Sequence, residues 1–271
     1  MTDTTSLQGI IRSMIEDAPP GSAAPLQKDI KTILNNDDSR KVIAEDLKQY
    51  HLNKNYKLVK LTDKDFGIIS KYNKSGLKYY DPLLKLKFDY DFDQLKVIDI
   101  EENGVEENAE INALNEKICD YALQHFPSFY KGMAIQDGEN ANIVYIIIVD
   151  ENLNDANFYN GRWQSFYKLD KGNGELTGEI TVKVHYYEDG NVALNTGKHI
   201  HETNINVDNI VETISMLEDE FEKALLKNFV ALNEHQFKNL RRQLPINRSK
   251  VQWGKSIRTY KLGQDAAEGR K

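Results

Sequence analysis

Cysteine is almost absent from this sequence, because Cys119 is the only one among 271 residues. A single cysteine cannot form an intrachain disulfide, and it cannot supply the several thiolates of a structural zinc site. Long hydrophobic runs are also missing: the longest is Ile143–Val149, whereas a membrane-spanning helix needs about 20 apolar residues. The first residues are polar, without the basic and apolar regions of a secretory signal. We therefore expect a cytoplasmic protein in a reducing compartment.

The motifs of common enzyme classes are missing as well. No glycine-rich phosphate loop joins a strand to a helix, and Gly172–Gly178 precedes a predicted strand, so we interpret it as a loop between strands. No nucleophile elbow is present, and acidic pairs such as Glu101–Glu102 lack the apolar surroundings of a catalytic carboxyl group. We expect no enzymatic activity, no cofactor and no metal.

One histidine cluster leaves an enzyme with a metal site as an alternative. His199 and His201 are two residues apart, so both imidazoles would share one face of a strand. His185, on a neighbouring predicted strand, is the candidate third ligand. We favour the simpler interpretation that these are solvent-facing histidines on an edge strand.

Charge is unevenly distributed along the chain. There are 35 basic and 42 acidic residues, a net charge of −7 that argues against general nucleic-acid binding. Residues 238–271 hold ten basic and two acidic residues, so this tail is +8 and the rest of the chain is −15. A basic tail on an acidic body indicates an arm that meets an acidic protein surface or an anionic lipid. Residues 91–120 hold ten acidic residues, and we interpret them as a solvated, partly disordered loop.

Hydrophobic periodicity predicts a mixture of helices and strands. Three helical stripes fall within residues 7–47, short strand-like pieces follow over Tyr56–Phe88, and helical spacing returns over Ile111–Phe126. Ile143–Val149 is β-branched and predicts a strand buried on both faces. The alternating run Gly178–Tyr187, followed by Asp-Gly and a second apolar run, predicts a hairpin and hence an antiparallel sheet.

The last part of the sequence predicts one long helix and one short helix. Apolar residues recur every three or four positions over Asp208–Leu244, which would give a helix about 55 Å long that ends at Pro245. Beyond it, Trp253, Ile257 and Tyr260 share one helical face, and basic residues occupy the other. So short a helix is marginal in isolation and needs a docking surface.

Four sequence elements resemble the F-actin capping protein alpha subunit family. They are Asn160-Gly161-Arg162-Trp163-Gln164-Ser165, the VHYYEDGNV run of Val184–Val192, the LRRQLP run of Leu240–Pro245, and an N-terminal part with Ala18–Gly21 and Leu34–Asp37. The similarity runs in order along almost the whole chain. Residues 91–120 and His199–Glu202 carry little of the pattern, and the extreme tail differs from it.

The resemblance implies an α+β fold and an obligate heterodimer with a beta subunit of the same fold. It implies N-terminal helices, an antiparallel sheet that continues into the partner to give ten strands, a long helix packed across that sheet, and a mobile amphipathic C-terminal tail. We therefore divide the chain into four parts that form one structural domain plus a tail. They are a helical stalk region at 1–55, a β-rich central region at 56–207, the long helix at 208–245 and the basic tail at 246–271.

The resemblance also implies a function. Family members bind the barbed ends of actin filaments independently of calcium and block subunit exchange there without severing, in cortical structures of the cytoplasmic actin cytoskeleton. Phosphoinositides release the cap, through Lys238 and Arg242, and regulatory proteins bind it. The residues expected to contact actin are Lys238, Arg242, Arg248, Lys250, Trp253, Lys255, Ile257, Arg258 and Tyr260. Two alternatives are a phosphoinositide-binding membrane adaptor and a cap for filaments of an actin-related protein.

Overall fold

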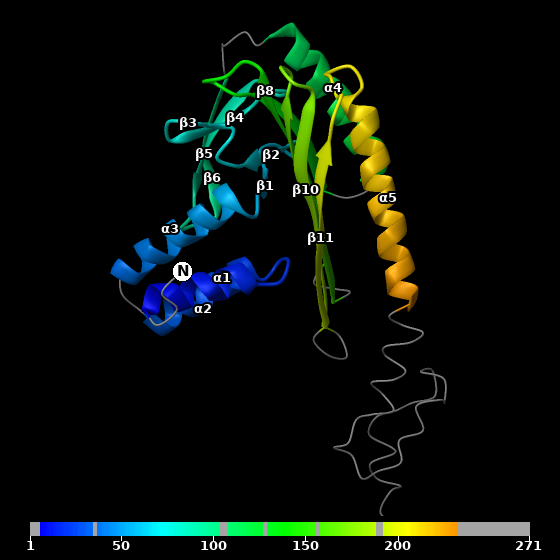
Figure 1. Ribbon diagram of the computed structural model, residues 1–271. Helices are drawn as coiled ribbons and strands as arrows, with labels where there is room; N and C mark the ends of the chain where they lie inside the picture. Colours follow the sequence, from blue (N-terminus) through cyan, green and yellow to red (C-terminus); the bar gives the residue numbers. More distant parts are fainter. Residues whose placement is uncertain are drawn as a thin grey trace, which may run out of the picture. The chain divides into compact units, whose positions relative to one another are not determined.

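The computed structural model describes residues 6–34, 37–102, 108–126, 129–154, 158–187 and 192–231 (Figure 1). The chain divides into a first compact unit of residues 1–215 and a second unit that begins at Met216. Every strand formed by the described residues belongs to the first unit. The boundary falls inside the helix α5 (Ile210–Ala231).

Three helices form the N-terminal layer, as the periodicity predicts. They are α1 (Leu7–Asp17), α2 (Ala23–Leu34) and α3 (Asp37–Asn53). Ser6 caps α1, because its Oγ accepts a hydrogen bond from the amide of Gly9 at 3.1 Å. The buried stripe of α1, Ile11 and Ile15, belongs to the same hydrophobic cluster as residues of α2 and α3. Burial of these stripes is what stabilises the layer.

Two small antiparallel sheets follow. The first pairs β1 (Lys57–Lys60) with β2 (Phe66–Ile69). The second has the order β3-β4-β5-β6, with bounds Lys74–Ser75, Lys78–Asp81, Leu86–Asp91 and Lys96–Glu102. These strands confirm the strand pattern predicted after Tyr56.

The prediction of a loop over residues 91–120 is wrong for most of the part described. This segment of the chain contains β6 and most of α4 (Ala109–His125). In β6 the acidic side chains have a partner: Lys78 Nζ lies 2.6 Å from Asp99 and 2.8 Å from Glu101. In α4 the acids face outward, while an apolar stripe that includes Ile118 is buried. The pattern of the apolar residues decides the structure here, and the charge count does not.

The main sheet has five antiparallel strands in the order β11-β10-β9-β8-β7 (Figure 1). Their bounds are β7 (Phe129–Gln136), β8 (Ile143–Asn154), β9 (Tyr159–Asp170), β10 (Glu175–Tyr186) and β11 (Val192–Glu202). The predicted buried strand is confirmed as β8, in which the side chains of Ile146 to Val149 have no solvent exposure. The predicted hairpin is confirmed as β10–β11, and the glycine-rich segment includes the turn between β9 and β10.

The two faces of this sheet have different neighbours. On one face Leu58 and Ile68 of β1–β2 share a hydrophobic cluster with Ile147 and Val149 of β8. The other face receives α4 at Gly132, where a Cβ atom would lie 2.6 Å from Cγ2 of Ile118. Glycine therefore permits the close approach of helix and strand at that point.

The predicted long helix is confirmed over the part that the structure describes. Ile210, Ile214, Leu217 and Phe221 are buried at the expected spacing of three and four residues. The helix begins two residues after the predicted start. Its predicted continuation to Leu244 lies outside the described residues.

Candidate interaction surfaces

The residues predicted to bind actin all lie outside the described residues. They are Lys238, Arg242, Arg248, Lys250, Trp253, Lys255, Ile257, Arg258 and Tyr260. The two residues predicted to bind phosphoinositides are among them. These assignments stay predictions, and the surfaces described below belong to the first unit.

The 160–165 element of β9 joins the sheet to the N-terminal segment. On one face of β9, Asn160 donates to the carbonyl oxygen of Pro20 at 3.2 Å, and Arg162 donates to that of Tyr56. Gln164 donates to the carbonyl of Lys54 at 3.0 Å and accepts from the amide of Tyr56 at 2.9 Å. Alternate residues of one strand thus satisfy backbone groups of the α1–α2 turn and of the chain between α3 and β1. Two elements of the family resemblance meet at Asn160 and Pro20.

Arg162 carries a buried charge at this junction, and its guanidinium forms an ion pair with Glu151 on the neighbouring strand. Burial lowers the pKa of Arg162 to about 10, which still leaves it charged at neutral pH. On the opposite face of the sheet, burial raises the pKa of Asp150 to about 6, an effect that the charge of Arg162 partly opposes. The Oδ1 atom of Asp150 is buried without a hydrogen-bond partner among the described residues.

A second buried ion pair connects the main sheet with the four-stranded sheet. Lys131 Nζ of β7 lies 2.8 Å from Oδ2 of Asp81 of β4. The two side chains are 9% and 0% exposed, respectively. Asp81 also accepts hydrogen bonds from the amides of Leu83 and Leu84. A buried pair of this kind fixes the relative position of the two sheets, because either charge alone would be unfavourable there.

Asn115 of α4 closes the outer edge of β7. Its Nδ2 donates to the carbonyl oxygen of Ala134 at 2.9 Å, and its Oδ1 accepts from the amide of Ala134 at 2.7 Å. These are the two bonds that a residue of a neighbouring strand would make. Asn115 is 1% exposed and also donates to the carbonyl of Ile111. A further strand therefore cannot pair with β7 at this position.

The same two bonds establish which backbone groups of β11 turn outward. Ala134 stands opposite Ile146, and its peptide groups turn away from β8. No register shift interrupts the sheet, so the direction of the peptide groups can be followed from strand to strand along opposed residues. This places the peptide groups of Gly178 of β10 toward β11, opposite Ile200. Ile200 bonds inward to β10, and its neighbours turn outward. The outward set, which we call the open edge, is Ala193, Asn195, Gly197, His199 and His201.

The open edge meets no other strand within the described ranges. Ten of its strand's eleven residues are at least partly exposed, with Ile200 as the buried exception. Unpaired edge groups of this kind are a template for another strand. The sequence did not single out Asn115, whereas it did predict an edge strand at His199 and His201. A polar residue inside the apolar stripe of Ile111, Leu114 and Ile118 is the signal that could have drawn attention to Asn115.

The structure contradicts the three-histidine metal alternative. His199 and His201 are exposed on an edge strand, as we favoured, and His201 Nδ1 lies 3.5 Å from Glu175. The register places His185 opposite Ala193, six residues from His199, which is a separation of roughly 20 Å along the strand. The part of the chain that the structure describes has no group of three or more side chains suited to hold a metal ion.

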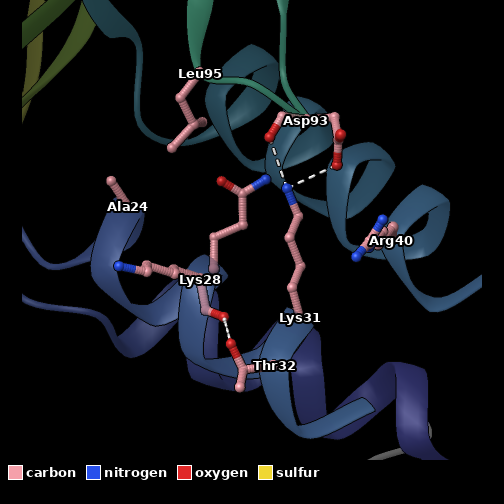
Figure 2. Close-up of a pocket in the computed structure, with 8 residues that line it drawn as sticks. Ala24, Lys28, Lys31, Thr32, Arg40, Asp93 and Leu95 are labelled. Carbon is pink, nitrogen blue, oxygen red and sulfur yellow. Dashed lines mark hydrogen bonds and ion pairs between the residues drawn. The ribbon is translucent and has the colours of Figure 1, made fainter. Parts of the chain in front are cut away.

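A cleft with a volume of about 590 Å³ lies between α2, α3 and the β5–β6 turn. Figure 2 shows Lys31 reaching across it to Asp93, whose carbonyl oxygen is at 2.6 Å and whose carboxylate is at 2.7 Å. Lys28 and Arg40 lie on either side of this pair (Figure 2). Because Lys31 of α2 is held by Asp93 in this way, the pair attaches α2 to the turn.

No helix of the described ranges is long and apolar enough to cross a membrane. Together, these features define an α+β protein organised around a five-stranded antiparallel sheet. One edge of that sheet is capped by a helix side chain, and the other edge is open.

Comparisons with known proteins agree with this class. The family description "F-actin capping protein alpha subunit" matches residues 11–265. The F-actin-capping protein subunit alpha of Candida glabrata is 40% identical over 261 residues, covering 96% of this chain and 97% of the relative. That of Saccharomyces cerevisiae is 37% identical, covering 98% and 99%.

A solved structure shares the fold. It is the homodimeric actin capping protein alpha subunit from Plasmodium berghei, with a TM-score of 0.68 at 22% identity, covering 82% of this chain and 90% of that one. On the family match and these relatives, the chain belongs to the F-actin capping protein alpha subunit family.

Proposed function

We propose that this protein is the alpha subunit of a heterodimeric capping protein that binds the barbed ends of actin filaments. The observation that carries the proposal is membership of the family along almost the whole chain. In this function the protein blocks subunit exchange at the filament end, independently of calcium and without severing. It acts as a binding protein with no catalytic step, in the cortical actin cytoskeleton of the cytoplasm.

The open edge supports the heterodimer part of the proposal. A partner with a five-stranded sheet of its own could place its edge strand antiparallel to β11, which would give one sheet of ten strands. The capped edge of β7 leaves β11 as the edge able to accept it. The pairing would use the outward backbone groups at Asn195, Gly197 and His199. We propose a beta subunit of the same fold as the owner of that strand.

Exposed apolar residues in each unit also support a partner. On α1, Leu7, Ile10 and Met14 are exposed at a spacing of three and four residues, on the face that flanks its buried stripe. On α5, Leu226 and Phe229 are exposed as well. Apolar groups gathered in this way usually mark a surface that another protein covers.

The basic tail is the proposed actin-binding element. Its positive charge would accelerate encounter with an acidic filament end, and burial of Trp253, Ile257 and Tyr260 would slow dissociation. Capping requires slow dissociation, so the apolar face of the tail matters as much as its charge. Lys238 and Arg242 are the proposed contacts of phosphoinositides, and regulatory proteins would bind the assembled dimer.

Seeded actin elongation with the co-expressed dimer tests this function. We expect nanomolar full-length dimer to stop barbed-end growth, and removal of Ile246–Lys271 to weaken capping at least about a hundredfold while leaving the dimer folded. Trp253→Ala with Ile257→Ala keeps every charge and should also weaken capping. Unchanged elongation, together with binding to phosphoinositide vesicles, would instead indicate a membrane adaptor. Growth arrest restricted to filaments of an actin-related protein would equally contradict the proposal.

A further inference from the structure

A small cavity lies where the N-terminal helices meet the main sheet. Its volume is about 160 Å³, enough for about five water molecules. Its walls include the Pro19–Gly21 turn, the aromatic rings of Tyr50 and His51, and side chains of β1, β8, β9 and β10. The cavity is within the first unit and is separate from the open edge of β11.

The lining of this cavity includes three cationic side chains and one carboxylate. The cations are Lys57, Arg162 and Lys183, and the carboxylate is Glu151. Glu151 is already engaged in the ion pair with Arg162. The lining therefore carries an excess of positive charge in partly buried surroundings, where an uncompensated charge is unfavourable.

Nearby acidic groups offset this excess only in part, because burial and the charge of Arg162 lower the pKa of Lys183 despite the opposing charges of Asp17 and Glu16. Glu16 at the end of α1 forms an ion pair with Lys54 at 2.7 Å, and Asp17 accepts a hydrogen bond from Ser13. Lys183 donates to the hydroxyl of Tyr50 at 3.3 Å, and Lys57 contacts the ring of Tyr90 at 5.9 Å from its centroid. Neither the hydrogen bond of Lys183 nor the ring contact of Lys57 supplies a negative charge to the cavity.

Two further observations indicate free capacity for an anion. The Nε atom of Arg162, a residue 7% exposed, is buried without a hydrogen-bond partner among the described residues. Burial, aided by Arg162, lowers the pKa of Lys57 to about 8. His51 is held neutral, because burial and the charge of Lys57 lower its pKa to about 3 against the opposing effect of its hydrogen bond with the carbonyl oxygen of Asn55. The lysine ammonium groups are thus the donors that the lining offers, and Arg162 adds its positive charge.

We propose that this cavity binds a small tetrahedral dianion, of the class of inorganic phosphate, between Lys57, Arg162 and Lys183. A bound dianion would neutralise the excess positive charge and cross-link β1, β9 and β10. It would therefore strengthen the junction between the N-terminal helices and the sheet. The proposal does not depend on actin capping.

Thermal unfolding of the full-length chain, in the complex in which it is purified, tests the site. Inorganic phosphate is titrated at pH 7.5 against sodium chloride of equal ionic strength. We expect phosphate to raise the melting temperature beyond the chloride control, with half-saturation on the order of 1 mM. Phosphorus NMR line broadening on the same samples should give the same half-saturation.

Lys57→Met and Lys60→Met form a matched pair on β1. Lys60 is exposed and pairs with Asp63, so Lys60→Met should keep the phosphate effect. Lys57→Met should lower phosphate affinity about tenfold or more, while raising the phosphate-free melting temperature because a buried charge is removed. If Lys57→Met fails to fold, Lys183→Met should show the same loss of affinity. An unchanged wild-type response relative to chloride, or equal phosphate effects in all variants, would overturn the proposal.

Discussion

The two edges of the main sheet differ in what their outward peptide groups meet. At β7 the outward groups of Ala134 bond to the buried side chain of Asn115, a residue of α4. At β11 the outward groups of the open edge meet no strand of the described chain, and most of the side chains are exposed. One asparagine makes the two ends of a regular five-stranded sheet unequal.

This difference teaches how a sheet can be given a single direction of growth. An edge strand is a general template for association, and proteins usually protect it with charges, proline or a covering element. Here the protection is an amide side chain that imitates the backbone of a neighbouring strand at one edge only. An assembly that grows through β11 alone closes after one partner, which is the behaviour expected of a dimer.

The edge formed by β7, which we call the closed edge, is tested most strongly at its buried ion pair. Lys131→Met would leave the carboxylate of Asp81 buried without its partner and should lower the unfolding free energy by about 3–5 kcal/mol. At this chain length we expect a fall of roughly 10 °C in the melting temperature. Asp81→Asn combined with Lys131→Met removes both charges and should recover much of the loss. Additive losses in the double variant would contradict the assignment of this pair.

The open edge is tested by proline at two adjacent positions. His199→Pro removes an outward amide, which proline at a sheet edge tolerates, so the chain should fold but bind its partner about a hundredfold more weakly. Lys198→Pro removes an inward amide and should unfold the β10–β11 hairpin. His199→Val controls for loss of the side chain. Analytical ultracentrifugation and circular dichroism give the two readouts, and equal unfolding by both prolines would show that the orientation of β11 is wrong.

Removal of the capping amide should weaken the closed edge. Asn115→Leu keeps the size of the side chain but leaves both backbone groups of Ala134 unsatisfied, at a cost of about 2 kcal/mol in unfolding free energy. Asn112→Leu makes the same change on a half-buried position of α4 and should have little effect. Denaturant unfolding measures both variants. If Asn112→Leu is as harmful as Asn115→Leu, the effect belongs to the helix and not to the edge.

The smallest effect concerns Asp150, in the strand next to the closed edge. Its pKa is about 6 in the folded chain and about 4 when unfolded, so the folded state holds the extra proton between these values. Stability therefore falls as pH rises from 4 to 6. Asp150→Asn should raise the unfolding free energy at pH 7.5 by about 1 kcal/mol, after allowance for solvent screening, and change little at pH 4. Asp63→Asn, on an exposed turn, is the control, and a gain equal at both pH values would contradict the assignment.

The sequence predicted local structure wherever one periodicity dominates. One face is buried in α1, α5 and β10, and the apolar residues of each recur at the period of that face. Both faces of β8 are buried, and its residues form one continuous apolar run. The loop prediction over residues 91–120 failed at β6, where abundant acidic residues concealed a strand, whereas the apolar spacing of Ile111–Phe126 predicted α4 correctly.

The site was harder to predict than the fold, for a physical reason. The closed edge depends on Asn115 meeting Ala134, and the junction depends on Arg162 meeting Tyr56, which are contacts between distant parts of the sequence. A motif such as 160–165 can indicate a family, but the partners of its side chains follow only from the strand order. The proposed actin-binding residues of the tail lie outside the described residues and stay predictions.

Hydrogen exchange at single-residue resolution tests the central claim most directly. The assembled dimer is compared with the intrinsic exchange rates of the same peptide sequence, at the amides of Asn195, Gly197 and His199. If β11 receives the partner strand, we expect these outward amides to be protected at least about a hundredfold, and we expect the same of the capped amide of Ala134. If they exchange at nearly the intrinsic rates in the intact dimer, the partner does not pair with β11 and the account of the open edge is wrong.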